Sequence, residues 1–75
     1  MASDVSFKNL GVIGLGYIGL PTAALFATRG LSVAGFDIEE QVVDTVNAGG
    51  VHFIEPGLDI AVRSAVSSGN LRAST

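Results

Sequence analysis

The stretch Gly11-Val-Ile-Gly-Leu-Gly-Tyr-Ile-Gly-Leu-Pro21 places four glycines and a proline inside an otherwise apolar segment. Glycines at this density are typical of a backbone that must turn tightly or approach another group closely. The apolar run Leu10–Ile13 predicts a short buried strand before the glycines. The alanine-rich and leucine-rich segment Ile18–Arg29 predicts a helix after them, with Pro21 in its first turn and Gly30 at its end.

The rest of the chain predicts a second strand and two further helices. Residues 31–36 form another short apolar run, and Glu39–Ala48 predicts a helix that two glycines terminate. Apolar residues recur at helical spacing over 58–66, and Leu71–Thr75 is a short extended stretch of the kind that leads towards another strand. This order indicates an α/β protein, a partial Rossmann fold that starts a doubly wound parallel sheet with two strands and about three helices.

Composition limits the class of protein. The sequence has 75 residues, of which 48% are hydrophobic and 15% charged, so it predicts one small folded domain rather than a disordered tail. The absence of cysteine excludes disulfides and thiolate metal ligands within this sequence, and it is compatible with the cytoplasmic location that we expect. A net charge of -3 without a cluster of lysine or arginine argues against a nucleic-acid partner or an anionic membrane surface.

One alternative is a membrane helix or a signal peptide, because residues 10–27 carry no charge over about the length that spans a bilayer. The glycines of this stretch and Pro21 weaken a lone helix. The residues before it offer only Lys8 against Asp4, which is a poor basic leader. We therefore expect no membrane partner.

The sequence Gly14-Leu-Gly16-Tyr-Ile-Gly19 matches the pattern G-x-G-x-x-G, which is weak evidence by itself. Here it follows a predicted strand, opens a predicted helix and precedes, by eighteen residues from Gly19, an acid at the tip of the next strand, Asp37. These three conditions together indicate a dinucleotide-binding site. The alternative is that the glycines are ordinary turn and packing residues and that Asp37 caps a helix.

Each residue of the motif has an expected role. Gly14 permits the tight turn, Gly16 lets the backbone approach a pyrophosphate, and Gly19 lets the helix lie close to the strand. The unpaired amides around Tyr17 and Ile18, in the first turn of the helix, then bind the pyrophosphate without any lysine.

Asp37 is expected to accept hydrogen bonds from the adenosine ribose hydroxyls, and its charge would repel the extra phosphate of NADP. The sequence Ile38-Glu-Glu-Gln41 that follows offers no arginine for that phosphate, so NAD is the expected cofactor.

Other polar residues carry weaker expectations. His52 has no second histidine or cysteine to share a metal with, so a structural or surface role is expected and no metal site is predicted. Glu55 precedes Pro56 and is expected to cap the third helix. Tyr17 has two open roles, to pack against the cofactor or to cover the helix start. No catalytic residue is predicted, because no acid or serine shows a partner.

Four segments together are similar to a known family. They are Gly14-Leu-Gly-Tyr-Ile-Gly-Leu-Pro-Thr-Ala23, Gly35-Phe-Asp-Ile38, His52-Phe-Ile-Glu-Pro-Gly-Leu58 and Gly69-Asn-Leu-Arg-Ala-Ser-Thr75. The chain from residue 8 onwards resembles the start of the UDP-glucose/GDP-mannose dehydrogenase family. Within it, the His52 loop and the Leu-Arg-Ala-Ser-Thr ending resemble most closely the members that oxidise UDP-N-acetyl-D-mannosamine.

The resemblance implies an enzyme that oxidises a nucleotide sugar to the uronic acid with NAD in two steps, through a thiohemiacetal on a cysteine. The cofactor residues carried over are Gly14, Gly16, Tyr17, Ile18, Gly19 and Asp37, whereas Val42 stands where some relatives have a ribose-binding lysine.

The resemblance also predicts the organisation of the chain. Residues 1–7 are expected to be a loose leader and residues 8–75 the N-terminal part of a dinucleotide-binding domain, inactive alone, whose parent enzyme binds the nucleotide sugar elsewhere and forms a homo-oligomer. Three alternatives stay open: oxidation of UDP-glucose or another nucleotide sugar, a non-enzymatic nucleotide-sensing module, and another reductase or hydroxyacid dehydrogenase with the same opening.

Overall fold

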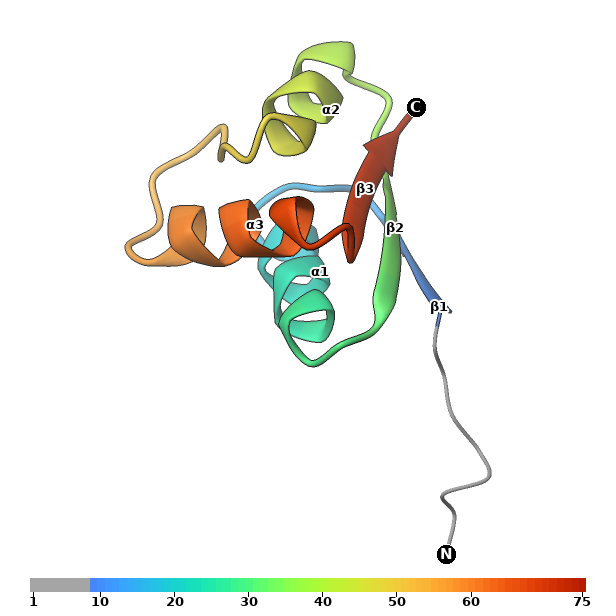
Figure 1. The fold of residues 1–75 in the computed structure, drawn as a ribbon. Helices are drawn as coiled ribbons and strands as arrows, with labels where there is room; N and C mark the ends of the chain where they lie inside the picture. The colour runs from blue at the N-terminus through green and yellow to red at the C-terminus, as the bar shows by residue number, and fades with distance from the viewer. Residues whose placement is uncertain (1–8) are drawn as a thin grey trace, which may run out of the picture.

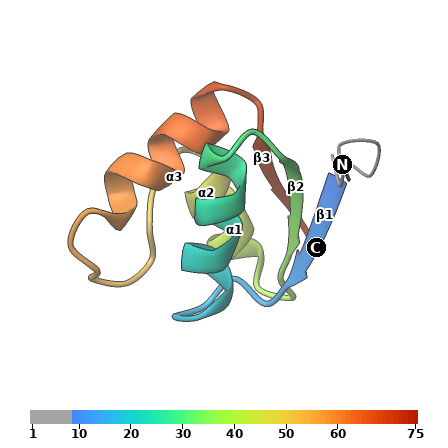
Figure 2. The same cartoon turned by 90° about the horizontal axis from the view of Figure 1, so that it is seen from below.

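A computed structural model describes residues 9–75, which form a three-stranded parallel sheet and three helices. The elements in chain order are β1 (Asn9–Ile13), α1 (Gly19–Thr28), β2 (Ser32–Phe36), α2 (Glu40–Asn47), α3 (Leu58–Ser67) and β3 (Leu71–Ser74). Strand β2 is central, and all three helices lie on the same side of the sheet (Figures 1 and 2). The predicted α/β, Rossmann-like fold class is confirmed, while the expected leader 1–7 lies outside the described residues.

The expected number of two strands is wrong, because residues 71–74 form a third strand. Strand β3 pairs in parallel with β2, and this pairing is bounded by hydrogen bonds from Val33 N to Asn70 O (2.7 Å) and from Asp37 N to Ser74 O (3.1 Å). A four-residue segment with Arg72 inside it has too short an apolar pattern to predict a strand. It becomes a strand because the second edge of β2 supplies partners for its backbone.

The three helices end near the glycines that were predicted to terminate them. Gly30, Gly49 and Gly69 each follow a helix in the left-handed conformation, with φ of 95°, 84° and 82°. At α1, Gly30 N donates to Ala27 O (3.1 Å) and Leu31 N donates to Phe26 O (3.2 Å), the paired bonds of a Schellman motif. This ending turns the chain sharply into β2.

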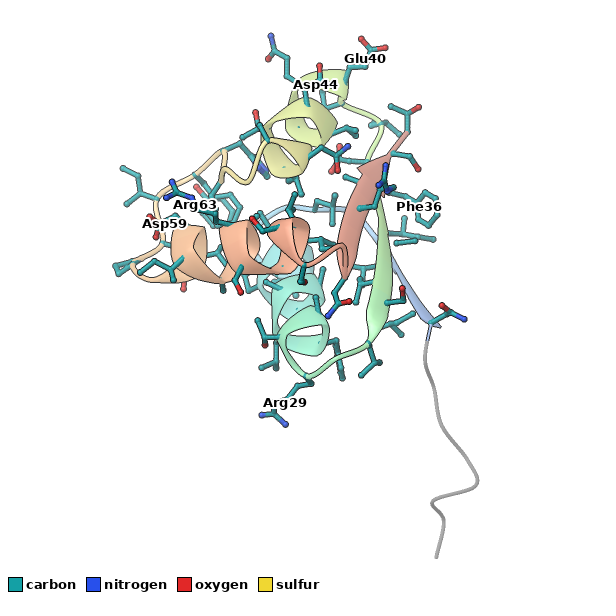
Figure 3. All side chains as sticks on the ribbon, in the orientation of Figure 1. Arg29, Phe36, Glu40, Asp44, Asp59 and Arg63 are labelled. Carbon is teal, nitrogen blue, oxygen red and sulfur yellow. The ribbon has the colours of Figure 1, made fainter. Side chains whose placement is uncertain are left out.

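The core lies between the sheet and the helices. Alternate strand residues point into it, so that Val33, Leu71 and Ala73 are buried, whereas Phe36 points away from the helices (Figure 3). The helices contribute apolar residues from one face each, which are Leu20, Ala23, Ala24, Ala27, Val43, Val46, Leu58, Val62 and Ala65. The uncharged stretch 10–27 is divided between β1, the glycine turn and α1, and no helix within residues 9–75 is long and apolar enough to cross a membrane.

The outer edge of β3 is occupied by a side chain. Asn47, the last residue of α2, donates from Nδ2 to Ala73 O (2.9 Å) and accepts at Oδ1 from Ala73 N (2.8 Å). The amide therefore satisfies the backbone groups that a neighbouring strand would otherwise pair with. It also ties α2 to the sheet.

We expect Asn47→Ala to lower the free energy of unfolding by about 1 to 2 kcal/mol, because two hydrogen bonds are lost and the Ala73 backbone groups keep no protein partner. Urea denaturation would measure the change. The control is Gln41→Ala on the exposed surface of the same helix, which should change it by less than about 0.5 kcal/mol. Equal effects of the two substitutions would contradict the assigned role of Asn47.

Candidate dinucleotide site

The candidate site lies where the carboxyl ends of β1 and β2 meet the start of α1. This is the end of a parallel sheet at which ligands bind in open α/β folds. A hollow of about 200 Å³ opens there, lined by Ile13, Gly14, Phe36, Asp37, Ile38 and Thr75. It brings together the first glycine of the motif and the predicted acid.

The glycine turn is fixed to the end of β2 by two hydrogen bonds. Gly14 adopts a φ of 88°, which requires glycine, and its N–H donates to Phe36 O at 2.7 Å. The next N–H, that of Leu15, donates to Oδ2 of Asp37 at 2.9 Å. The turn and the acid are therefore parts of one hydrogen-bonded unit.

The other two glycines face different surroundings. A Cβ atom at Gly19 would overlap the carbonyl oxygen of Gly14, so this glycine lets the first turn of α1 lie against the loop. Gly19 was expected to let the helix lie close to the strand. The closest contact at Gly19 is with the glycine loop at Gly14, and the strand residue Val12 lies farther away. A Cβ atom at Gly16 would meet no protein atom within 4 Å, so the space beside it is open. No protein contact accounts for a glycine at position 16.

The start of α1 presents free hydrogen-bond donors. Among residues 9–75, no backbone or side-chain acceptor receives the N–H groups of Gly16, Tyr17 or Ile18, and no side chain caps the helix. The Tyr17 and Ile18 side chains are 71% and 83% exposed. Free amides and the helix dipole give this end a partial positive charge of about half a unit, which favours a bound anion.

Asp37 orients its carboxylate with two backbone donors. Besides Leu15 N at Oδ2, Glu39 N donates to Oδ1 at 2.9 Å. These two hydrogen bonds, that from Leu15 first, hold the pKa of the Asp37 carboxyl below its usual value, so the group is ionised near neutral pH. A carboxylate has about four acceptor positions, and two are left for ligand hydroxyls. The bond to Glu39 resembles the alternative role as a cap, but the bond to Leu15 aims the carboxylate at the turn.

Sequence analysis missed the role of Leu15. Its side chain is fully buried and packs against β2 at Gly35, where a Cβ atom would lie 2.8 Å from Leu15 Cδ2. The Leu15 side chain therefore anchors the turn to the core, while the Leu15 N–H donates to the Asp37 carboxylate at the site. A glycine in the interior of a predicted strand is the signal that would have indicated such a close approach.

The loop between α2 and α3 lies against the turn. The rings of Tyr17 and Phe53 have centroids 4.4 Å apart, so Tyr17 contacts this loop. The expectation that Glu55 caps α3 with its side chain is wrong. The helix begins after Gly57 with no side-chain cap, and Glu55 contributes its backbone carbonyl, which accepts from Leu58 N at 3.1 Å. The Glu55 side chain is exposed.

The described residues fit a dinucleotide and show no metal site. The free donors, the open space at Gly16 and the spare acceptor positions of Asp37 meet the needs of a diphosphate and a ribose. Residues 9–75 hold no group of three or more histidine, cysteine, aspartate or glutamate side chains that could bind a metal ion.

Residues 8–75 match the family model described as "UDP-glucose/GDP-mannose dehydrogenase family, NAD binding domain". The chain belongs to this family. Its cofactor is therefore NAD, as the glycine motif and Asp37 predicted. The resemblance noted in the sequence is confirmed over nearly the whole chain.

Individual relatives bear different sugar names. The chain is 54% identical over 74 residues to an NDP-N-acetyl-D-galactosaminuronic acid dehydrogenase of Ralstonia nicotianae, covering 99% of the chain and 18% of that protein. It is 56% identical over 71 residues to a UDP-N-acetyl-D-mannosamine dehydrogenase of Escherichia coli K12, covering 95% and 17%. The structure of a UDP-glucose dehydrogenase from Pyrobaculum islandicum superposes with a TM-score of 0.87 at 40% identity, covering 92% and 16%. The chain thus spans less than a fifth of the length of these relatives.

We expect the two glycines with opposite surroundings to respond differently to the same change. Gly19→Ala should lower the free energy of unfolding by about 2 kcal/mol or more, because the new methyl group overlaps a backbone oxygen. Gly16→Ala, the matched control, should leave it within about 0.5 kcal/mol, because the methyl group meets no protein atom. Thermal unfolding of both variants measures this, and equal destabilisation would refute the stated geometry.

Proposed function

We propose that the corner formed by the glycine turn, the start of α1 and Asp37 binds the adenosine diphosphate part of NAD. In this proposal Gly14 and Gly19 shape the turn, Gly16 leaves room for the pyrophosphate, and the N–H groups at Tyr17 and Ile18 donate to it. The observation that supports it best is the group of free donors beside an ionised, oriented carboxylate. When bound, NAD supplies the hydride acceptor for the oxidation of an alcohol.

The activity proposed for the parent protein is that of an NAD-dependent nucleotide-sugar dehydrogenase. Residues 8–75 would be the N-terminal part of its dinucleotide-binding domain, which binds and orients the cofactor but performs no turnover alone. The remainder of the enzyme would bind the substrate and supply the catalytic groups. The whole enzyme would form a homo-oligomer, lie in the cytoplasm and act in polysaccharide biosynthesis. The relatives named above, all dehydrogenases, support this activity.

The proposed substrate is UDP-N-acetyl-D-mannosamine, oxidised to the uronic acid. High sequence identity to a protein named for this sugar supports the choice. Identity is similar to a protein named for an N-acetylgalactosamine derivative, so other nucleotide sugars, including UDP-glucose, are the second candidate. A cofactor-binding segment does not contact the sugar in this proposal, so it is similar among enzymes with different substrates.

Turnover assays of the full-length protein that carries this segment test the activity. We expect reduction of NAD with UDP-N-acetyl-D-mannosamine, followed at the absorbance of NADH, at a higher kcat/KM than with UDP-glucose or UDP-N-acetyl-D-galactosamine. A higher value with another UDP-sugar would correct the substrate alone. NAD binding without turnover of any nucleotide sugar would favour a nucleotide-sensing module or another dehydrogenase and overturn the proposed enzyme class.

Asp37→Asn tests the ribose contact. We expect the affinity for NAD to fall about tenfold and the ratio of NADP to NAD affinity to rise, because the charge that repels a 2′-phosphate is removed. Titration calorimetry with both cofactors gives the ratio. Asp44→Asn, an equal change on the outer surface of α2 (Figure 3), is the control and should leave both affinities unchanged. An unaltered ratio in Asp37→Asn would count against the contact.

A further inference from the structure

The peptide of Tyr17 is the part of the glycine turn that hydrogen bonds leave unfixed. On either side of it, Gly16 O accepts from Leu20 N at 3.0 Å and Ile18 O accepts from Thr22 N at 3.2 Å. Within residues 9–75, neither the N–H nor the carbonyl of Tyr17 has such a partner. The carbonyl lacks one because a helical carbonyl pairs with the N–H four residues later, and Pro21 has no N–H.

An aromatic side chain from another part of the chain contacts Tyr17 at this point. The centroids of the Tyr17 and Phe53 rings are 4.4 Å apart and the ring planes are inclined at 40°. A tilted pair of rings this close is a favourable contact. No backbone hydrogen bond joins residues 14–18 to residues 51–54 in the part of the chain that the structure describes. The ring contact is therefore a restraint on Tyr17 that the backbone does not provide.

Phe53 is itself anchored in the protein. In the loop between α2 and α3, Val51 and Phe53 are half-buried and pack against the core, whereas Ile54 beside them is 94% exposed. Side chains packed on a protein core have restricted positions. Phe53 thus gives the mostly exposed Tyr17 side chain a fixed surface to lie against.

In the proposed function, the Tyr17 N–H is one of the donors to the diphosphate. A donor that is already oriented binds more tightly than one that the ligand must order, because ordering lowers the affinity. We propose that Phe53 is a positioning residue for NAD binding, whose ring fixes the Tyr17 side chain and, through it, the peptide that donates to the diphosphate. This inference rests on the proposed function of the corner and adds a residue from outside the glycine motif.

The ring contact lies apart from the hollow beside Asp37. The turn contributes only Gly14 to the lining of that hollow, and the loop of residues 51–57 contributes nothing to it. In the proposed function this hollow and Asp37 bind the adenosine part of NAD. Loss of the Phe53 ring should therefore weaken the contacts to the diphosphate and spare those to adenosine, a division that general loss of structure would not produce.

The experiment measures the dissociation constants of NAD and of adenosine for the full-length protein, as wild type, Phe53→Ala, Tyr17→Ala and the double variant. For Phe53→Ala we expect about fivefold weaker NAD binding, the size of one aromatic contact, and unchanged adenosine binding. Because Phe53 acts through Tyr17, the double variant should bind NAD as Tyr17→Ala does. Ile54→Ala, which removes an exposed side chain of the same loop, is the control and should bind both ligands like wild type.

The outcomes separate this inference from the proposed function. Undiminished NAD affinity in Phe53→Ala, equal losses for NAD and adenosine, or additive losses in the double variant would refute the role of Phe53 while the corner stands. If wild type binds no NAD, the proposed function itself is wrong.

Circular dichroism of each variant shows whether it is folded. Should Phe53→Ala fail to fold, Tyr17→Ala decides the proposal, because it removes the same contact from a mostly exposed side chain. A loss of affinity for NAD and not for adenosine in Tyr17→Ala would then support the positioning role, and the absence of such a selective loss would overturn it.

Discussion

The hydrogen bond from Leu15 N to the Asp37 carboxylate joins the glycine turn to the acid at the end of β2, and the rest of the site depends on it. With the neighbouring bond from Gly14 N to Phe36 O, it fixes the glycine turn to the end of β2. The turn in turn sets where α1 begins, because Gly19 lies directly against the Gly14 carbonyl. A helix start held in this way keeps its free amides in one place, which is the condition for binding an anion with backbone groups alone.

The same carboxylate joins structure to recognition. Two of its acceptor positions stabilise the chain through Leu15 and Glu39, and the others remain for a ligand. In the proposed function, such sharing lets an acidic segment, with a net charge of -3, offer a phosphate site. In the proposed function, the backbone donors bind the diphosphate, and the Asp37 carboxylate that orients the turn also distinguishes the ribose from its 2′-phosphorylated form.

The two edge strands of the sheet differ because the Asn47 side chain covers part of the β3 edge. Asn47 pairs with the outward backbone groups of Ala73 and so protects β3. Strand β1 pairs with β2 alone among the described residues, and the sheet face that carries Ile13 and Phe36 is covered by none of the three helices. The helix-covered face holds the core, and the candidate site lies at the carboxyl end of the sheet.

The sequence by itself predicted two of the three strands, the three helices and the cofactor NAD, because glycine spacing, apolar runs and an acid after a strand are local patterns with a direct steric or electrostatic meaning. Three features depended on tertiary structure. Strand β3 forms only where β2 offers an edge, Leu15 anchors the turn only because Gly35 leaves room for it, and the contact of Tyr17 with Phe53 joins segments far apart in the chain. Glu55 was misassigned for the same reason, since the entry into α3 is set by Gly57 and the backbone of its turn instead of by a side-chain cap.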